Sequence, residues 1–289
     1  MFVQLVTDGL AVGGLYALTA VGVVVVFRNT RTINLAQGDF AMMGAFIALL
    51  LLKGLGLHYL ATVAITVIAV MGIGVITERI VMRPLADSDW LILFHATLGV
   101  YFILHGVAGL LWGRDTKSFP ITFDTTPVDF LGAAISKGHL INVSWTIGIG
   151  VVLFLFFKYT RQGIALRAVT DDPEAARMMG IPVRFIVMLT WAVAGFLAAF
   201  AGVLTAPIIY VSPEMMDDVL IKGYVAAVFG GLYSIPGAIV GALMIGVAEN
   251  LAGGYIGSHY KTVTAFAMIV VLLSLRPQGL FAIQQRREI

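Results

Sequence analysis

The chain of 289 residues is 60% hydrophobic and only 12% charged, with a mean hydropathy of +0.97. Soluble domains carry about 25% charged residues, so the composition excludes an ordinary soluble enzyme and indicates a polytopic membrane protein. The absence of cysteine excludes disulfides, thiolate metal sites and cysteine nucleophiles. The net charge of +2 decides little, because the location of lysine and arginine matters more than their sum.

Apolar stretches of spanning length predict the main helices in chain order. They fall at about 3–27, 60–82, 91–112, 140–157, 185–207 and 259–275. Three further stretches are shorter or interrupted: 38–52, 219–232 and 235–252. No segment alternates with a period of two, so a transmembrane barrel is excluded. The predicted fold class is all-α, a polytopic membrane protein of eight or nine helical segments that include broken or short helices.

We expect a single transmembrane domain over 1–289, since no segment is long or polar enough for a separate soluble domain. The first apolar run has no basic flank and is too long for a signal sequence, which predicts a retained span. Whether 219–232 crosses fully or re-enters is left open by the sequence.

The distribution of basic residues predicts the sidedness of the chain. Alternating the segments puts twelve of the 18 lysines and arginines on one side, which should therefore be cytoplasmic if 219–232 crosses. The amino terminus is then outside, the carboxyl terminus is cytoplasmic, loop 158–184 is cytoplasmic, and loop 113–139 is external with short strands or an irregular cap. The cytoplasmic set is Arg28, Arg31, Arg79, Arg83, Lys158, Arg161, Arg167, Arg177, Arg184, Arg276, Arg286 and Arg287. The external set is Lys53, Arg114, Lys117, Lys137, Lys222 and Lys261.

The stretch "RAVTDDPEAARMMGIP" (167–182) predicts a short helix with defined ends. Asp172 suits the N-cap, Pro173 the first helical position and Glu174 the first turn. Gly180 and then Pro182 end the helix. It has about seven residues, which is too few to be stable alone in water.

Two interpretations of this short helix stay open. One face would present Ala175, Met178 and Met179 to a socket on a partner protein, with Glu174 and Arg177 near the rim. Alternatively the helix lies on lipid headgroups, and Arg167, Arg177 and Arg184 contact phosphates.

Two interruptions of apolar segments suggest a path for a small polar solute. "INLAQGDF" (33–40) sets polar side chains beside the start of a short helix, and "FGGLYSIPGAIVGAL" (229–243) joins a glycine break to a new helix start. The alternative is that glycine and proline are simply common in membrane helices. Both interruptions precede a short apolar helix, which suggests a weak internal repeat. The candidate pathway-lining residues are Asn34, Gln37, Asp39, Gly230, Gly231, Tyr233, Ser234 and Pro236.

Other polar and small residues within the spans have simpler interpretations. Asp8 and Glu249 are expected near the outer ends of their spans, facing the membrane interface. His95 and His105 fall on opposed helix faces, so they do not form a metal pair. Asn250 is a further polar residue within a span. Glycines four residues apart, Gly9/Gly13 and Gly237/Gly241, predict close packing of helices.

The sequence lacks the motifs of an energy-coupling or hydrolytic enzyme. It has no G-x-x-x-x-G-K-[ST] phosphate loop, no H-E-x-x-H and no G-x-S-x-G. We therefore expect no catalytic residues, metal or cofactor, and a transport path that is powered by something other than this chain.

Three stretches resemble the permease subunits of branched-chain amino-acid ABC importers. They are "GLYALTAVGVVVVFRNTRTINLAQGDFAMMGAF", "GIALRAVTDDPEAARMMGI" and "VFGGLYSIPGAIVGALMIGVAENL", in the expected order over nearly the whole chain. The length and an early I-N-x-A-x-G-x-x motif resemble the shorter, high-affinity subunit type. Gln37 stands where histidine is more usual and Asp39 where glutamate is common, which leaves the exact solute open.

The resemblance implies a permease for leucine, isoleucine or valine in a bacterial inner (plasma) membrane. It also implies a second related permease subunit, two cytoplasmic ATPase subunits and an external solute-binding protein, and no nucleic-acid partner. Alternatives are the same importer type for urea or short amides, a self-sufficient secondary transporter or channel, and a membrane scaffold. The implied ATPase-coupling residues are Arg167, Asp172, Pro173, Glu174, Ala175, Arg177, Met178, Met179 and Gly180.

Overall fold

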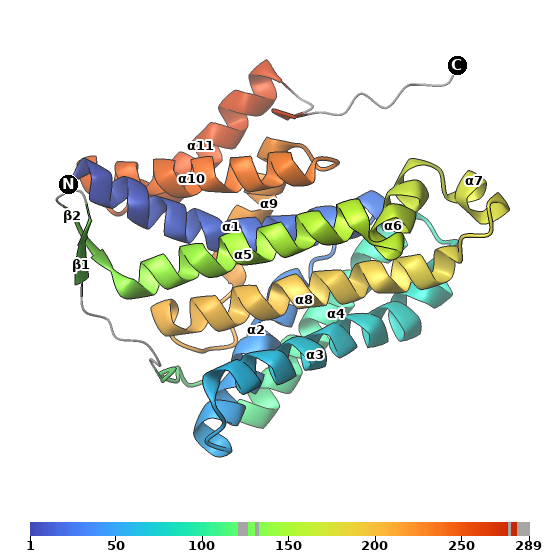
Figure 1. The fold of residues 1–289 in the computed structure, drawn as a ribbon, viewed down its shortest axis with the longest axis horizontal. Coiled ribbons are helices and arrows are strands. Elements are labelled where there is room, and N and C mark those ends of the chain that lie inside the picture. The colour runs from blue at the N-terminus through green and yellow to red at the C-terminus, as the bar shows by residue number, and fades with distance from the viewer. Residues whose placement is uncertain (121–126, 131–132, 277–278, 282–289) are drawn as a thin grey trace.

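The structure is a computed structural model that describes residues 1–120, 127–130, 133–276 and 279–281. All nine apolar segments are helical in it, and the all-α fold class is confirmed (Figure 1). The helices are α1 (Phe2–Thr30), α2 (Gln37–Leu49), α3 (Tyr59–Thr77), α4 (Trp90–Trp112), α5 (Lys137–Tyr159), α6 (Arg161–Asp171), α7 (Pro173–Met178), α8 (Val183–Ile209), α9 (Asp217–Gly230), α10 (Ile235–Tyr255) and α11 (Tyr260–Leu275).

Several of these helices are long enough to cross a membrane. α2 continues through a π-helical turn over Leu50–Gly54, and α3 continues through turns over Glu78–Met82 and Arg83–Leu85. With these extensions, α1, α2, α3, α4, α5, α8 and α10 are the seven stretches of the described chain that have the length and hydropathy of a span. α11 is apolar but shorter. The chain is therefore an integral membrane protein.

α1 forms the centre of the helix bundle. Every residue from Gly13 to Val26 is buried, and α8, α9 and α10 pack around this helix. Small residues permit the close approach of α10: a Cβ on Gly13 would lie 2.9 Å from the carbonyl oxygen of Ala242. A Cβ on Gly9 would lie 2.6 Å from the Cα of Val247, so the close packing predicted for this glycine pair is confirmed.

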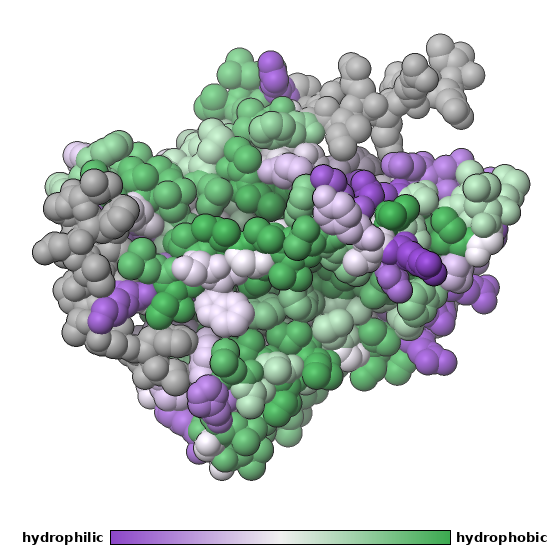
Figure 2. Space-filling model, in the orientation of Figure 1, coloured by the Kyte–Doolittle hydropathy of each residue, from purple (hydrophilic) through white to green (hydrophobic). Residues whose placement is uncertain are grey.

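α4 and α5 lie at the periphery and expose large apolar side chains. Leu110 on α4 is 87% exposed, and Phe102 and Phe154 are also exposed. Figure 2 shows a broad apolar surface over the middle of the molecule, with hydrophilic side chains gathered near α6 and α7. Such a surface suits lipid or another membrane subunit.

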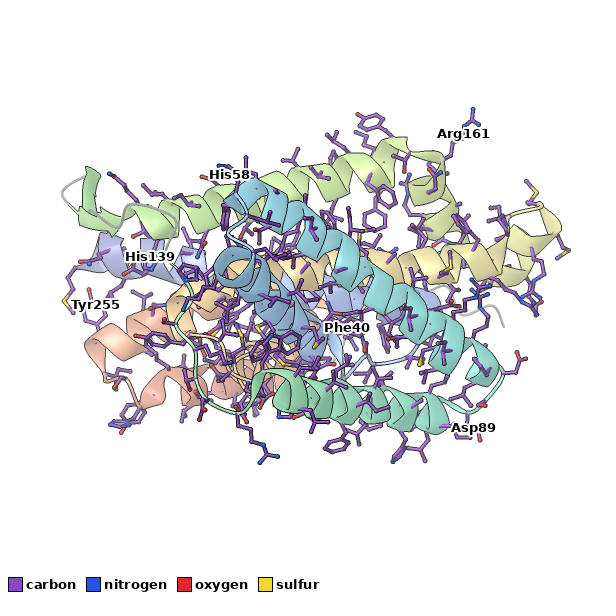
Figure 3. The ribbon with its side chains drawn as sticks, turned by 90° about the horizontal axis from the view of Figure 1, so that it is seen from below. Phe40, His58, Asp89, His139, Arg161 and Tyr255 are labelled. Atoms are coloured by element: carbon purple, nitrogen blue, oxygen red, sulfur yellow. The ribbon has the colours of Figure 1, made fainter. Side chains whose placement is uncertain are left out.

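The long helices run between two ends of the bundle, which we call the α7 end and the hairpin end. α6 and α7 lie at the α7 end, and the antiparallel strands β1 (Pro127–Phe130) and β2 (Ala133–Ser136) lie at the hairpin end (Figure 1). The short strands expected within 113–139 are thus present. In Figure 3, Asp89 and Arg161 lie at the α7 end, and His139 and Tyr255 lie at the hairpin end.

α9 begins inside the bundle rather than at the hairpin end. The chain forms a β-bridge between Val211 and Lys117, turns, and starts α9 only at Asp217. A Cβ on Gly223 would lie 2.8 Å from Thr19, near the middle of α1. The 14 residues of α9 extend about 21 Å, less than the hydrocarbon thickness of about 30 Å. The helix in the segment 219–232 therefore starts inside the bundle and ends at the α7 end, and whether this segment crosses the membrane stays open.

Candidate functional site

The start of α2 is built by amide side chains that bond to backbone and to each other. Asn34 Nδ2 donates to Gln37 Oε1 at 3.1 Å, and Gln37 Nε2 donates to the carbonyl of Ala194 on α8 at 3.1 Å. Asn34 Oδ1 accepts from the backbone N–H of Ala36, and the Tyr224 hydroxyl on α9 donates to the carbonyl of Asn34. Both amides are fully buried within this chain. They hold the interrupted backbone in place, and a pathway-lining role for Asn34 and Gln37 stays a prediction.

Asp39, in the first turn of α2, meets the first turn of α9. Its carboxylate is 4% exposed, and its Oδ1 lies 3.5 Å from Nδ1 of His105 on α4. His105 Nε2 lies 3.9 Å from Glu214, and Asp217 interacts electrostatically with both Asp39 and His105. The Tyr101 ring stacks on the imidazole with centroids 5.5 Å apart. These four groups, Asp39, His105, Glu214 and Asp217, are called the acidic cluster below.

A buried ion pair joins α9 to α10 and α1. Lys222 Nζ lies 3.1 Å from Glu249 Oε1 and 2.7 Å from Asp218 Oδ2, and the Tyr16 hydroxyl donates to Glu249 Oε2 at 3.0 Å. Glu249 is 2% exposed, so the expectation that it faces the interface is wrong. Lys222, which the sequence assigns to the outer side, is 6% exposed within the bundle, and its sidedness stays a prediction. The other expected interface carboxylate, Asp8, is half-buried and bonds to His139 at 2.7 Å.

The turn between α9 and α10 is the second predicted interruption. Gly231 has φ 103, which favours glycine, and the Ser234 hydroxyl accepts from the N–H of Gly237 at 3.1 Å to cap α10. The backbones of Gly230 and Gly237 are in contact, because a Cβ on Gly230 would lie 2.1 Å from the carbonyl carbon of Gly237.

This turn lies toward the α7 end. The Tyr233 ring packs on Phe27, three residues before α1 ends, with centroids 5.3 Å apart. Pro236 occupies the first turn of α10 and is exposed. The start of α10 therefore does not lie deep in the bundle, whereas the start of α9 does. A pathway-lining role for residues 230–236 stays a prediction.

α7 has the length and the caps that the sequence predicts. Its six residues follow Asp172, whose Oδ1 accepts from the backbone N–H groups of Glu174 and Ala175 at 2.9 Å each. Gly180, just after the helix, has φ 81. Met178 and Met179 are 83% and 84% exposed. The C-terminal end of α7 and its cap thus present two methionines to their surroundings.

A small core attaches α6 and α7 to the rest of the molecule. It consists of Leu166 and Val169 on α6, Ala176 on α7 and Ile186 on α8, separate from the main core. Thr170 on α6 donates to Asn29 Oδ1 near the end of α1 at 3.1 Å. The face of α7 that packs inward is therefore small. Of the remaining predicted coupling residues, Arg167, Pro173, Glu174 and Arg177 are exposed, and Ala175 is half-buried.

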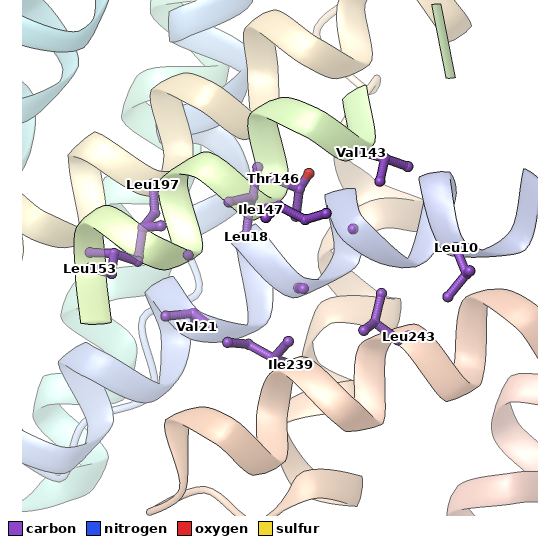
Figure 4. Close-up of a pocket in the computed structure, with 13 residues that line it drawn as sticks. Leu10, Leu18, Val21, Val143, Thr146, Ile147, Leu153, Leu197, Ile239 and Leu243 are labelled. Atoms are coloured by element: carbon purple, nitrogen blue, oxygen red, sulfur yellow. The ribbon is translucent and has the colours of Figure 1, made fainter. Parts of the chain in front are cut away.

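Two cavities differ in chemistry. A cavity of about 470 Å³ at the α7 end is lined by Arg79, Arg177 and Arg184 and by the Arg83–Glu78 pair, whose closest atoms are 2.8 Å apart. A cavity of about 260 Å³ between α1, α5, α8 and α10 is lined by aliphatic side chains, with Thr146 as its polar member (Figure 4). The aliphatic cavity has no charged side chain in its lining, so it is unsuited to a zwitterion.

Comparison with known proteins decides the family. The family model for the permease component of branched-chain amino acid transport systems matches residues 5–273. The chain belongs to this family. The family resemblance seen in the sequence is confirmed, and its relatives are transport permeases rather than enzymes.

Individual relatives cover nearly the whole permease. This chain is 30% identical to the high-affinity branched-chain amino acid transport system permease protein LivH of Escherichia coli, over 96% of this chain and 95% of LivH. It is 33% identical to the corresponding protein BraD of Pseudomonas aeruginosa, again over 96% and 95%. A chain in the structure of PsaBC from Streptococcus pneumoniae in complex with Fab matches with a TM-score of 0.52 at 15% identity, over 99% of this chain and 94% of that chain. That likeness shows a shared fold.

Sequence reasoning missed three features of this site. The meeting of Asp39 with His105 joins positions 66 apart, and no local pattern pairs them. The start of α9 did carry a signal, since Asp217 and Asp218 precede an apolar run as acids do in a first helical turn. The start of α6 also carried a sequence signal, the threonine at its N-cap. The Thr160 hydroxyl accepts from the backbone N–H of Gly163 at 2.9 Å.

Proposed function

We propose that this permease is a transmembrane subunit of an ATP-driven importer and forms half of the translocation pathway for branched-chain amino acids. The observation that carries the proposal is α7, a six-residue helix whose last residue, Met178, and C-cap, Met179, are both more than four-fifths exposed. The solute class is supported by the names of relatives that cover nearly the whole chain.

A helix of this size needs external support to act as a mechanical element. Helices shorter than about 12 residues are marginal in water, and one buried alanine supplies little packing. Exposed methionines adapt to a partner's apolar socket, and Glu174 and Arg177 offer charges beside it. We infer that an ATPase subunit grips α7 and that its motion passes through α6 and α8 to the bundle.

The α7 end is proposed to be cytoplasmic. Arg79, Arg83, Arg177 and Arg184 surround one cavity there, in keeping with an excess of basic residues on the cytoplasmic side. The amino terminus then lies outside and the carboxyl terminus inside. Two ATPase subunits bind at this end, a second related permease completes the pathway, and an external binding protein delivers the solute at the hairpin end.

The test replaces both exposed methionines at the end of α7, Met178 and Met179, in native cells. Met178→Asp/Met179→Asp should abolish co-purification of an ATPase subunit and reduce leucine uptake at least about tenfold, while the permease stays in the membrane fraction. Ile164→Asp is the matched control, because Ile164 is 50% exposed on the neighbouring α6. Full uptake together with retained ATPase in the double variant would refute the proposal. Leucine flux into vesicles that contain the permease alone, driven by an ion gradient, would favour the secondary transporter.

A further inference from the structure

The acidic cluster brings the carboxyl groups of Asp39, Glu214 and Asp217 near one imidazole, that of His105. In the described part of the chain, none of the three carboxylates forms an ion pair with a lysine or arginine. The nearby Lys222 already contacts Asp218 and Glu249. Among the residues that the structure describes, the His105 imidazole is thus the one basic side chain that forms an ion pair with these acids.

Asp39 has an unused acceptor at the buried side of this cluster. Its side chain is 96% buried, yet Oδ2 accepts no hydrogen bond from any described residue. The 3.5 Å separation between Oδ1 and His105 is longer than a normal hydrogen bond of this kind. A buried acceptor without a donor costs about 1–3 kcal/mol, and more when it is charged. A donor brought by a ligand would recover that cost.

The cluster opens toward a polar environment. His105 lies seven residues before the end of α4, about 10 Å inside the bundle along the helix. At that depth Glu214 is still 57% exposed, and a carboxylate facing hydrocarbon is costly. This face of the permease therefore meets water or another protein surface. A path that admits a polar solute would provide such a polar environment for Glu214.

The geometry points to recognition of a primary ammonium group by the acidic cluster during passage of the solute. This inference rests on the proposed transport of amino acids and adds which end of the solute this chain binds. An ammonium supplies three donors and one positive charge. Asp39 Oδ2 is the unpaired acceptor that it would reach, and Asp217 and Glu214 add carboxyl groups nearby.

The absence of cysteine makes a direct chemical test possible. Glu214→Cys introduces one thiol at the exposed edge of the cluster in full-length permease in native membranes. Its reaction rate is measured with an ammonium-bearing and with a sulfonate-bearing methanethiosulfonate reagent. Nearby carboxylates should favour the ammonium reagent by about tenfold or more, and Asp39→Asn or Asp217→Asn should each reduce that preference. Asp115→Cys, an exposed position at the hairpin end, is the matched control whose preference should not respond to Asp39→Asn.

Protection experiments identify the recognised group. Leucine and 3-methylbutylamine, which both carry the ammonium, should slow labelling of Glu214→Cys, whereas 4-methylpentanoate, which lacks it, should not. Equal rates for both reagents, equal protection by 4-methylpentanoate, or no labelling at all would overturn the inference. Leucine uptake by the unmodified chain is measured in parallel. Normal uptake without charge preference refutes the ammonium site alone, whereas absent uptake with amine protection refutes the proposed function alone.

Discussion

Removing the cation of the buried Lys222–Glu249 pair should be the most damaging single charge change in the bundle. Lys222→Met leaves the Glu249 carboxylate, which is 2% exposed, with the Tyr16 hydroxyl as its one donor among the described residues. Breaking a buried pair in this way costs about 3–5 kcal/mol in the free energy of unfolding. Removing both charges in Lys222→Met/Glu249→Gln avoids the uncompensated charge, so the double variant should recover most of that loss.

The assay is SDS-induced unfolding of purified permease in mixed micelles, followed by tryptophan fluorescence. Trp191 is fully buried, so its emission reports loss of the core. Lys158→Met is the control, since Lys158 is exposed at the end of α5 and should change stability by about 0.5 kcal/mol or less. Equal destabilisation of the single and double variants, or no effect of Lys222→Met, would refute the interpretation of this pair as a mutually compensated buried charge.

Three further changes test the packing and the caps. Gly230→Ala should destabilise the bundle by about 2 kcal/mol or more, because its Cβ would lie 2.1 Å from backbone; Gly99→Ala, where nothing lies within 4 Å, is the control in the same unfolding assay. Gln37→Leu should cost about 2 kcal/mol, because the buried Asn34 Nδ2 loses its acceptor, and circular dichroism should show an unchanged helix content. Asp172→Ala should cost about 1 kcal/mol locally and lower leucine uptake, with faster hydrogen exchange in α7.

The helices were predictable because hydropathy and capping act locally. Each apolar run produced a helix near its expected position, and α7 begins and ends where Asp172 and Gly180 indicate. Gly9 and Gly13 marked a close contact because small residues leave room for a neighbouring backbone. These features require no knowledge of which helix lies next to which.

The polar interior was less predictable because it depends on tertiary contacts. Glu249 was assigned to the interface from its position near a helix end, but Lys222 from α9 reaches and neutralises it. Similarly, Asn34 and Gln37 bond to one another and to α8, contacts that sequence spacing does not specify. The position of Lys222 within the bundle depends on where α9 begins, and a hydropathy scan does not locate the start of a helix that begins inside the bundle.

The most direct test of the account is the accessibility of α7 from each side of the membrane. Met179→Cys in the cysteine-free chain is exposed to a membrane-impermeant maleimide in intact cells and in inside-out vesicles, with and without co-expressed ATPase subunits. The account predicts labelling in inside-out vesicles, loss of labelling when the ATPase subunits are bound, and none from outside. Labelling in intact cells, or labelling in vesicles that the ATPase subunits leave unchanged, would contradict it.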